Sequence, residues 1–253
     1  GGLSITKHIK QQLPYEKLIY VADTLHAPYG NKTEDSIIER VNTLAEKLLQ
    51  QQVKALVVAC NTATVNTIDQ LRKKITIPII GVEPAIKPAT THSKNKKVGV
   101  LVTQATANNP RFLALIDKFA NGVEVIIQPC PGLVELIEQG HINALKCENL
   151  LNHYLTPLIR KEVDTIVLGC THYPFLQQQI AAISRQAHTE VNIIETAAPV
   201  TLQLRKKLFE ANLCTKSAIQ PEHLFFSSKP DKKQQALFSQ LWHDEIQLRA
   251  FNF

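Results

Sequence analysis

The sequence lacks several features that would mark specialised protein classes. Its 253 residues include no methionine and one tryptophan, and only 6% are aromatic. No apolar run approaches the roughly 18 to 20 residues that cross a bilayer, so an integral membrane protein is excluded and no membrane partner is expected. The five cysteines are widely spaced and form neither a CxxC pair nor a Cys/His cluster with zinc spacing. Neither a disulfide scaffold nor a metal site is therefore expected, and a cytoplasmic location is predicted.

The charge balance gives little support for a nucleic-acid partner. There are 28 Lys and Arg against 22 Asp and Glu, a formal net charge of +6. The basic residues lie in short clusters near expected helix ends or in polar loops, where they keep the surface solvated. No recognition helix or base-stacking motif accompanies them, so we expect no nucleic-acid binding.

The pattern of hydrophobic residues predicts an α/β fold. Short apolar runs alternate with amphipathic stretches, which is typical of βαβ units around a mostly parallel sheet. The helix with the clearest periodicity follows Thr33, with Glu34 and Asp35 in its first turn. A second helix is expected over 200–213. The predicted strands are 18–22, 55–59, 77–82, 98–103, 123–128, 165–168 and 191–194.

Two polar crossings that contain proline suggest two domains. They lie near 81–97 and 194–199. We predict a first α/β domain of residues 1–84 plus 194–253 and a second of residues 85–193. Both would be three-layer domains with mostly parallel sheets, with the active site in the cleft between them.

Two of the predicted strands end in the same way. An apolar run leads to Cys60-Asn61-Thr62, and another leads to Cys170-Thr171-His172. Ligands of open α/β sheets bind beyond the carboxyl ends of the strands, so both thiols are expected at a ligand site. A helical stretch is expected to follow each thiol, and a helix N-terminus lowers a thiol pKa. A cysteine at one strand end is commonly only a small buried hydrophobe, but the pair favours a chemical role.

Three chemistries could use such thiols. Acyl transfer would need one nucleophile and would leave the second cysteine without a role. Thiol redox chemistry would need Cα atoms within about 7 Å of each other, whereas these strand ends should face each other across a ligand. Proton transfer on opposite faces of one carbon uses both thiols and inverts the stereocentre. This third chemistry accounts best for the repeated pattern.

At this point the sequence resembles a known family. The segments 59–63, 169–174 and 131–140, together with Asp23-Thr24 and Pro28-Tyr29-Gly30, are similar to the signature motifs of the glutamate racemases. The resemblance is ordered and spans essentially the whole chain. It implies a cofactor-independent isomerase that interconverts L- and D-glutamate and supplies D-glutamate for peptidoglycan. It also implies glutamate as the ligand, no cofactor and a homodimer.

The resemblance also implies residue roles at matching positions. Cys60 and Cys170 correspond to the acid/base thiols, with His172 and Glu138 as acid/base partners on the side of Cys170. Local alternatives remain: the residues after Cys60 could be ordinary helix caps, Glu138 could be simply solvated, and the Tyr-Gly pair could be only a turn. Asp23 and His26 are expected to be structural. The matching substrate-binding positions are Tyr29, Gly30, Asn61, Thr62, Thr106, Thr171 and His172.

The sequence departs from the family pattern in three places. Family members begin with a strand and Phe-Asp-Ser-Gly-x-Gly-Gly-Leu-Ser, whereas this sequence begins at Gly1-Gly2-Leu3-Ser4. We therefore expect a truncated N-terminus, and we expect a chain without that strand, Asp and Ser to be less active and less stable. Glu195-Thr196 replaces the usual Asp-Ser pair, and Asn109 and Phe112 replace Ser and Tyr, which should tune activity. The alternatives are a degenerate racemase that binds a dicarboxylic amino acid without turnover, and an aspartate racemase relative.

Overall fold

Parallel strands form the framework of this protein, whose computed structural model describes residues 1–251. All six strand pairings are parallel, and they form sheets with the orders β5-β4-β6-β7, β1-β8-β9 and β2-β3. The predicted α/β class with mostly parallel sheets is confirmed. The strands are β1 Ile19–Ala22, β2 Leu56–Val58, β3 Ile79–Gly81, β4 Lys97–Val102, β5 Glu124–Pro129, β6 Thr165–Leu168, β7 Asn192–Ile194, β8 Leu224–Ser227 and β9 Leu248–Ala250.

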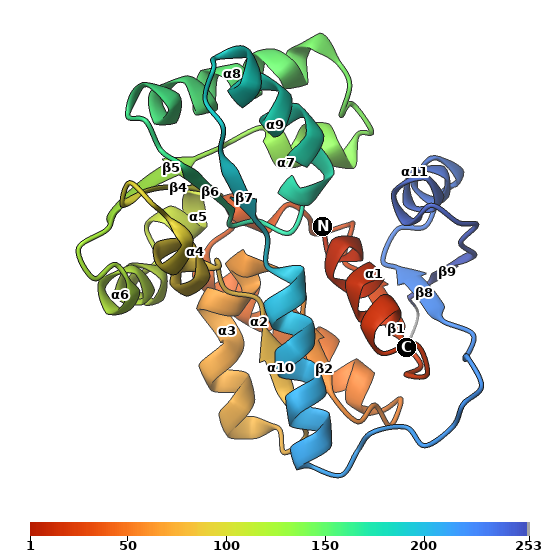
Figure 1. The fold of residues 1–253 in the computed structure, drawn as a ribbon. Coiled ribbons are helices and arrows are strands. Elements are labelled where there is room, and N and C mark those ends of the chain that lie inside the picture. Colours follow the sequence, from red (N-terminus) through yellow and green to blue (C-terminus); the bar gives the residue numbers. More distant parts are fainter. Residues whose placement is uncertain (252–253) are drawn as a thin grey trace.

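The four-stranded sheet is covered on both faces. Alternate residues of β4 enter different cores: Val100 packs into one cluster of buried side chains and Leu101 into another. In β6, Val167 packs into the same cluster as Val100, and Leu168 packs into the same cluster as Leu101. This arrangement explains the nearly continuous apolar sequence of these strands. The helices around this sheet, in the upper and left-hand parts of Figure 1, are α4 Ile86–His92, α5 Gln104–Ala107, α6 Pro110–Phe119, α7 Leu133–Glu138, α8 Leu145–Arg160 and α9 Gln177–Gln186.

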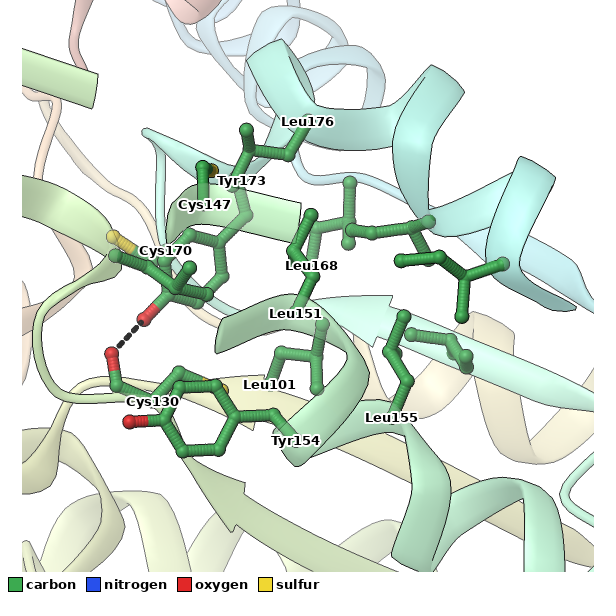
Figure 2. Packing of buried hydrophobic residues seen from close by; sticks show 14 of the residues in the cluster. Leu101, Cys130, Cys147, Leu151, Tyr154, Leu155, Leu168, Cys170, Tyr173 and Leu176 are labelled. Atoms are coloured by element: carbon green, nitrogen blue, oxygen red, sulfur yellow. Dashed lines mark hydrogen bonds between the residues drawn. The ribbon is translucent and has the colours of Figure 1, made fainter. Parts of the chain in front are cut away.

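One of these cores reaches the end of β6. Figure 2 shows Cys130, Cys170 and Tyr173 next to a group of leucines from the sheet and from α8. The Tyr173 hydroxyl donates a hydrogen bond to the carbonyl of Cys130 at 3.4 Å. Tyr173 is fully buried. The loop that carries Cys170 is therefore fixed by packing rather than exposed to solvent.

The other half contains the two smaller sheets. Within residues 1–251, β1 pairs only with β8, and β2 pairs only with β3. A cavity of about 610 Å³ is lined by both β1 and β2 and reaches the ends of these strands. The helices here are α1 Leu3–Gln12, α2 Glu34–Leu49, α3 Asn61–Lys74, α10 Ala197–Glu210 and α11 Lys232–Trp242, with the 3₁₀ turn η1 Tyr29–Asn31 near β1. A second 3₁₀ turn, η2 Tyr173–Leu176, follows β6 in the half with the four-stranded sheet.

The C-terminal part of the chain packs against the N-terminal part. α10 lies against α1, and β8 pairs with β1 (Figure 1). The helix predicted over 200–213 begins at Ala197 and ends at Glu210. β8 and β9 were not predicted, because they are short and acquire their partners only in the folded chain. The domain boundaries near 84 and 194 stay a prediction. Among residues 1–251, no helix has the length and apolar character needed to cross a membrane.

Candidate functional site

Both cysteines at the strand ends face one cavity. Cys60 follows β2 by two residues, Cys170 follows β6 by two residues, and both line the cavity of about 610 Å³. The Thr171 hydroxyl donates a hydrogen bond to the carbonyl of Ala59 at 3.2 Å, which joins the two strand-end loops. The prediction that these loops meet at a ligand site agrees with this geometry.

Cys60 is held by backbone groups. It caps the N-terminus of α3, and its Sγ accepts a hydrogen bond from the amide of Ala63 at 3.4 Å. Burial raises the pKa of this thiol, and the helix amides only partly oppose that effect. The expectation that the helix N-terminus would give Cys60 a lowered pKa is therefore wrong. Cys60 rather than Asn61 or Thr62 caps the helix, so these two residues are not N-caps.

Cys170 has a different setting. It is only 6% exposed and is followed by the 3₁₀ turn η2, while α9 begins later, at Gln177. The expected α-helix N-terminus directly after this thiol is thus absent. Burial raises the pKa of Cys170 to about 12. The backbone amide of His172 lowers this pKa only in part, so the thiolate needs further help from a nearby base.

That help is available from His172 and Glu138. The Nδ1 of His172 lies 3.6 Å from the Sγ of Cys170, and its Nε2 lies 2.6 Å from the Oε1 of Glu138. Burial lowers the pKa of His172. Burial alone would raise the pKa of Glu138, whereas its hydrogen bond to His172 favours the ionised carboxylate and lowers the pKa. A neutral imidazole with its proton on Nε2 fits this pair and leaves Nδ1 able to accept the thiol proton. Glu138 is therefore not simply a solvated side chain.

Three threonine hydroxyls meet near Cys60. Thr62 Oγ1 lies 2.9 Å from Thr103 Oγ1 and 3.3 Å from Thr106 Oγ1, and the last two are 3.0 Å apart. Sequence reasoning selected Thr62 and Thr106 but missed Thr103. Thr103 directly follows β4, so the rule that ligands bind beyond strand ends could have identified it.

Asn61 has unused hydrogen-bonding capacity. It is only 2% exposed, and neither its Oδ1 nor its Nδ2 has a hydrogen-bond partner among residues 1–251. Leaving a buried amide unpaired costs about 1–3 kcal/mol per group. The Asn61 amide is the unpaired polar group next to Cys60, although the side chain does not itself line the cavity.

The turn at Tyr29 and Gly30 forms another wall. Both residues line the cavity, and Gly30 lies so close to Thr103 that a Cβ there would be 3.2 Å from the Thr103 Cβ. The Tyr29 hydroxyl donates a hydrogen bond at 2.7 Å to Asp23, which lines the same cavity. Of the predicted site residues, Asn61 and Thr106 alone do not line the cavity; the Thr106 hydroxyl contacts that of Thr62, which does. Across residues 1–251, no group of three or more His, Cys, Asp or Glu side chains could hold a metal ion.

Comparison with known proteins gives consistent matches. The Asp/Glu/Hydantoin racemase family matches residues 1–200. A glutamate racemase of Pseudomonas putida is 43% identical over 252 residues, which cover 99% of this chain and 94% of that protein. A glutamate racemase of Methylococcus capsulatus is 42% identical over 242 residues, which cover 96% of this chain and 88% of that protein.

Solved structures agree with these matches. A glutamate racemase isoform from Bacillus anthracis superposes with a TM-score of 0.90 at 28% identity, covering 100% of this chain and 94% of that one. The glutamate racemase of Francisella tularensis in complex with D-glutamate has a TM-score of 0.85 at 30% identity, covering 98% and 91%.

Proposed function

This chain belongs to the Asp/Glu/Hydantoin racemase family, and we propose that it interconverts L- and D-glutamate by passing the α-proton between Cys60 and Cys170. It is an isomerase, and no pyridoxal cofactor is needed for this reaction. The observation that carries the proposal is the position of two thiols, each just beyond the end of a parallel strand, on one shared cavity. One thiol is used on each face of the α-carbon.

The proton balance of the reaction is simple. In one direction the Cys170 thiolate takes the α-proton and becomes a thiol, while the electron pair stays on the α-carbon. The Cys60 thiol then donates its proton to the opposite face and becomes a thiolate. The reverse direction exchanges these roles, so a complete cycle neither gains nor loses a proton.

Burial makes both thiols suited to this demanding step. An α-proton of an amino acid is weakly acidic, and a thiolate whose conjugate acid has a raised pKa is a stronger base. The cost is that little thiolate is present at neutral pH. His172, with Nδ1 at 3.6 Å from Cys170, can take that thiol proton while Glu138 orients the imidazole.

Uncharged groups bind the two carboxylates of the substrate. The three hydroxyls around Thr62, the side chain of Asn61 and the segment at Thr171 supply donors beside the thiols. Donors aimed at a carboxylate also stabilise the negative charge that develops when the α-proton leaves. Tyr29 and Gly30 complete the wall, and the hydroxyl of Tyr29 is already engaged by Asp23.

The cellular role follows from the product. The enzyme supplies D-glutamate for peptidoglycan, in the cytoplasm, and it works as a homodimer. Sedimentation equilibrium at micromolar concentrations tests the last point, since a dimer would have twice the 28.3 kDa mass of one chain.

Incubation with L-glutamate in D₂O without pyridoxal phosphate tests the proposed reaction. We expect the α-proton NMR signal and the optical rotation both to disappear. Cys60→Ala and Cys170→Ala should each abolish the loss of rotation, whereas Cys214→Ser, at an exposed thiol, should not. If calorimetry shows that glutamate binds while the wild-type α-proton remains, a binding protein without turnover replaces the proposal. Faster turnover of L-aspartate would instead identify an aspartate racemase.

A further inference from the structure

We propose that Asp23 and Arg40 are positioning residues of the Cys60 side of the site, because together they fix the Tyr29 hydroxyl and with it the turn that lines the cavity. This inference rests on the proposed function, since it concerns how the same site holds glutamate. It revises the expectation that Asp23 is only structural. The geometry of the carboxylate is the starting point.

Four donors converge on Asp23. Arg40 reaches its two oxygens with two nitrogens, at 2.8 Å from Nε and 2.6 Å from the terminal nitrogen. The Tyr29 hydroxyl donates to the same carboxylate at 2.7 Å, and His26 Nδ1 lies 3.1 Å away. The Asp23 side chain is only 8% exposed. Because all of its accepting positions are engaged within the protein, Asp23 does not act on the substrate directly.

The carboxylate stays ionised in this setting. Burial opposes ionisation, but the hydrogen bonds from Arg40 and Tyr29 outweigh it, so the pKa of Asp23 is lowered. Burial and the bond to Asp23 raise the pKa of Tyr29, so the phenol keeps its proton and donates it to Asp23. A two-pronged Arg–carboxylate contact fixes orientation as well as charge.

These residues connect the two ends of the loop between β1 and α2. Asp23 directly follows β1, Tyr29 and Gly30 form η1, and Arg40 lies on α2, which begins at Glu34. Asp23 thus ties the start of the loop to the helix that ends it. The Tyr29 ring packs in the same apolar cluster as Cys60, and Gly30 meets Thr103 across the cavity. A shift of the Tyr29 hydroxyl would therefore move a wall shared by the thiol and the hydroxyl cluster.

Variants at the two ends of this contact test the inference. Tyr29→Phe removes only the hydroxyl, and Asp23→Asn removes the charge at nearly constant shape. Each is expected to raise KM for both enantiomers about tenfold and to change kcat less. Since both changes break one chain of contacts, the double variant should be no more than about twofold worse than the worse single variant. Arg40→Lys keeps the charge, loses the two-pronged contact and should raise KM as well.

A matched control is the carboxylate just before β6. Asp164 is also held by several donors, from Ser93 and from the amides of Lys94 and Asn95, but it does not line the cavity. Asp164→Asn should lower the melting temperature while leaving KM within about twofold. Unchanged KM in folded Asp23→Asn and Tyr29→Phe, or effects that multiply in the double variant, would overturn the inference. If the wild type does not turn glutamate over, the proposed function fails, and the calorimetric Kd of D-glutamate for the same variants still decides the positioning role.

Discussion

The two halves of the site hold equivalent thiols by different means. Cys60 is set by backbone, at the N-cap of the fourteen-residue helix α3 with the Ala63 amide on its sulfur. Cys170 has no such helix: one backbone amide, that of His172, contacts it, and its nearby base is the imidazole of His172, which is bound to Glu138. The comparison teaches that a repeated strand-end cysteine does not imply a repeated environment. The half-site at Cys170 should therefore be the easier one to weaken by substitution without removing a thiol.

Thermodynamics limits which kinetic constants can reveal the difference between the two half-sites. L- and D-glutamate have equal free energy in solution, so kcat/KM must be equal in both directions for the wild type and for every variant. A weakened half-site can lower kcat/KM only by the same factor in both directions, whereas it can change kcat, KM, isotope effects and proton exchange differently for each enantiomer. The measurements below therefore follow each enantiomer individually.

Removal of one thiol should have the largest effect. We expect Cys60→Ala and Cys170→Ala each to reduce racemisation by about 10³–10⁴-fold, because the second face of the α-carbon then has no acid or base. The remaining thiol can still remove the α-proton it faces and return deuterium to the same face. Each variant should thus exchange the α-proton of one enantiomer only, with opposite preference, as measured by NMR at constant optical rotation.

The control for this pair is a cysteine that lies elsewhere. Cys147 is fully buried in the core of the four-stranded sheet, so Cys147→Ala should cost stability but leave racemisation in the folded enzyme unchanged. A single-thiol variant that exchanges both enantiomers equally would contradict the assignment of one cysteine to each face.

Weakening the side chains at Cys170 should have the next largest effect. We expect His172→Gln to lower kcat/KM about 10²-fold and Glu138→Gln about tenfold, since the first removes the acceptor and the second only its partner. The primary deuterium isotope effect on kcat should increase most in the direction that begins at Cys170. The double variant should resemble His172→Gln alone, and multiplicative losses would show that Glu138 acts independently.

The sequence predicts the parts of the molecule that depend on local pattern. The helix after Thr33 and the strand over 165–168 were predicted closely, because capping, periodicity and unbroken apolar runs are written in consecutive residues. The rule that ligands bind beyond strand ends also predicted that Cys60 and Cys170 share a ligand site, and both line one cavity. The pair β8 and β9 was missed: β8 pairs with β1, about 200 residues earlier, and β9 pairs only with β8 among the described residues.

The errors at the site have a common physical cause. The direction of the thiol pKa shifts is set by burial, which depends on how remote segments pack. Similarly, the strand-end rule could have selected Thr103 after β4, but not its contact with Thr62, which lies on α3. Such contacts between segments do not leave a local pattern in one sequence.

The fall of activity at low pH tests the role of His172 beside Cys170. Burial lowers the pKa of His172 below its usual 6.5, so the imidazole should stay neutral at that pH and able to accept the Cys170 proton. As the pH falls through the lowered pKa, His172 becomes protonated and the relay is lost. Activity should therefore hold at pH 6.5 and decline below it, and His172→Gln should lack that step. A wild-type decline centred above pH 6.5 would contradict this explanation.

Loss of one hydroxyl beside Cys60 should have the smallest effect. Thr103→Val keeps the shape of the side chain but removes the oxygen that contacts both Thr62 and Thr106. We expect KM to rise about three- to fivefold with kcat nearly unchanged, because the two remaining hydroxyls keep their 3.3 Å contact but lose the group that orients them. Since Thr103 also caps the short helix α5, Thr103→Ser is the matched control: it keeps the cap and the oxygen and should restore KM. An equal rise of KM in the serine variant would show that the methyl group, through its packing against the turn at Gly30, matters more than the hydroxyl.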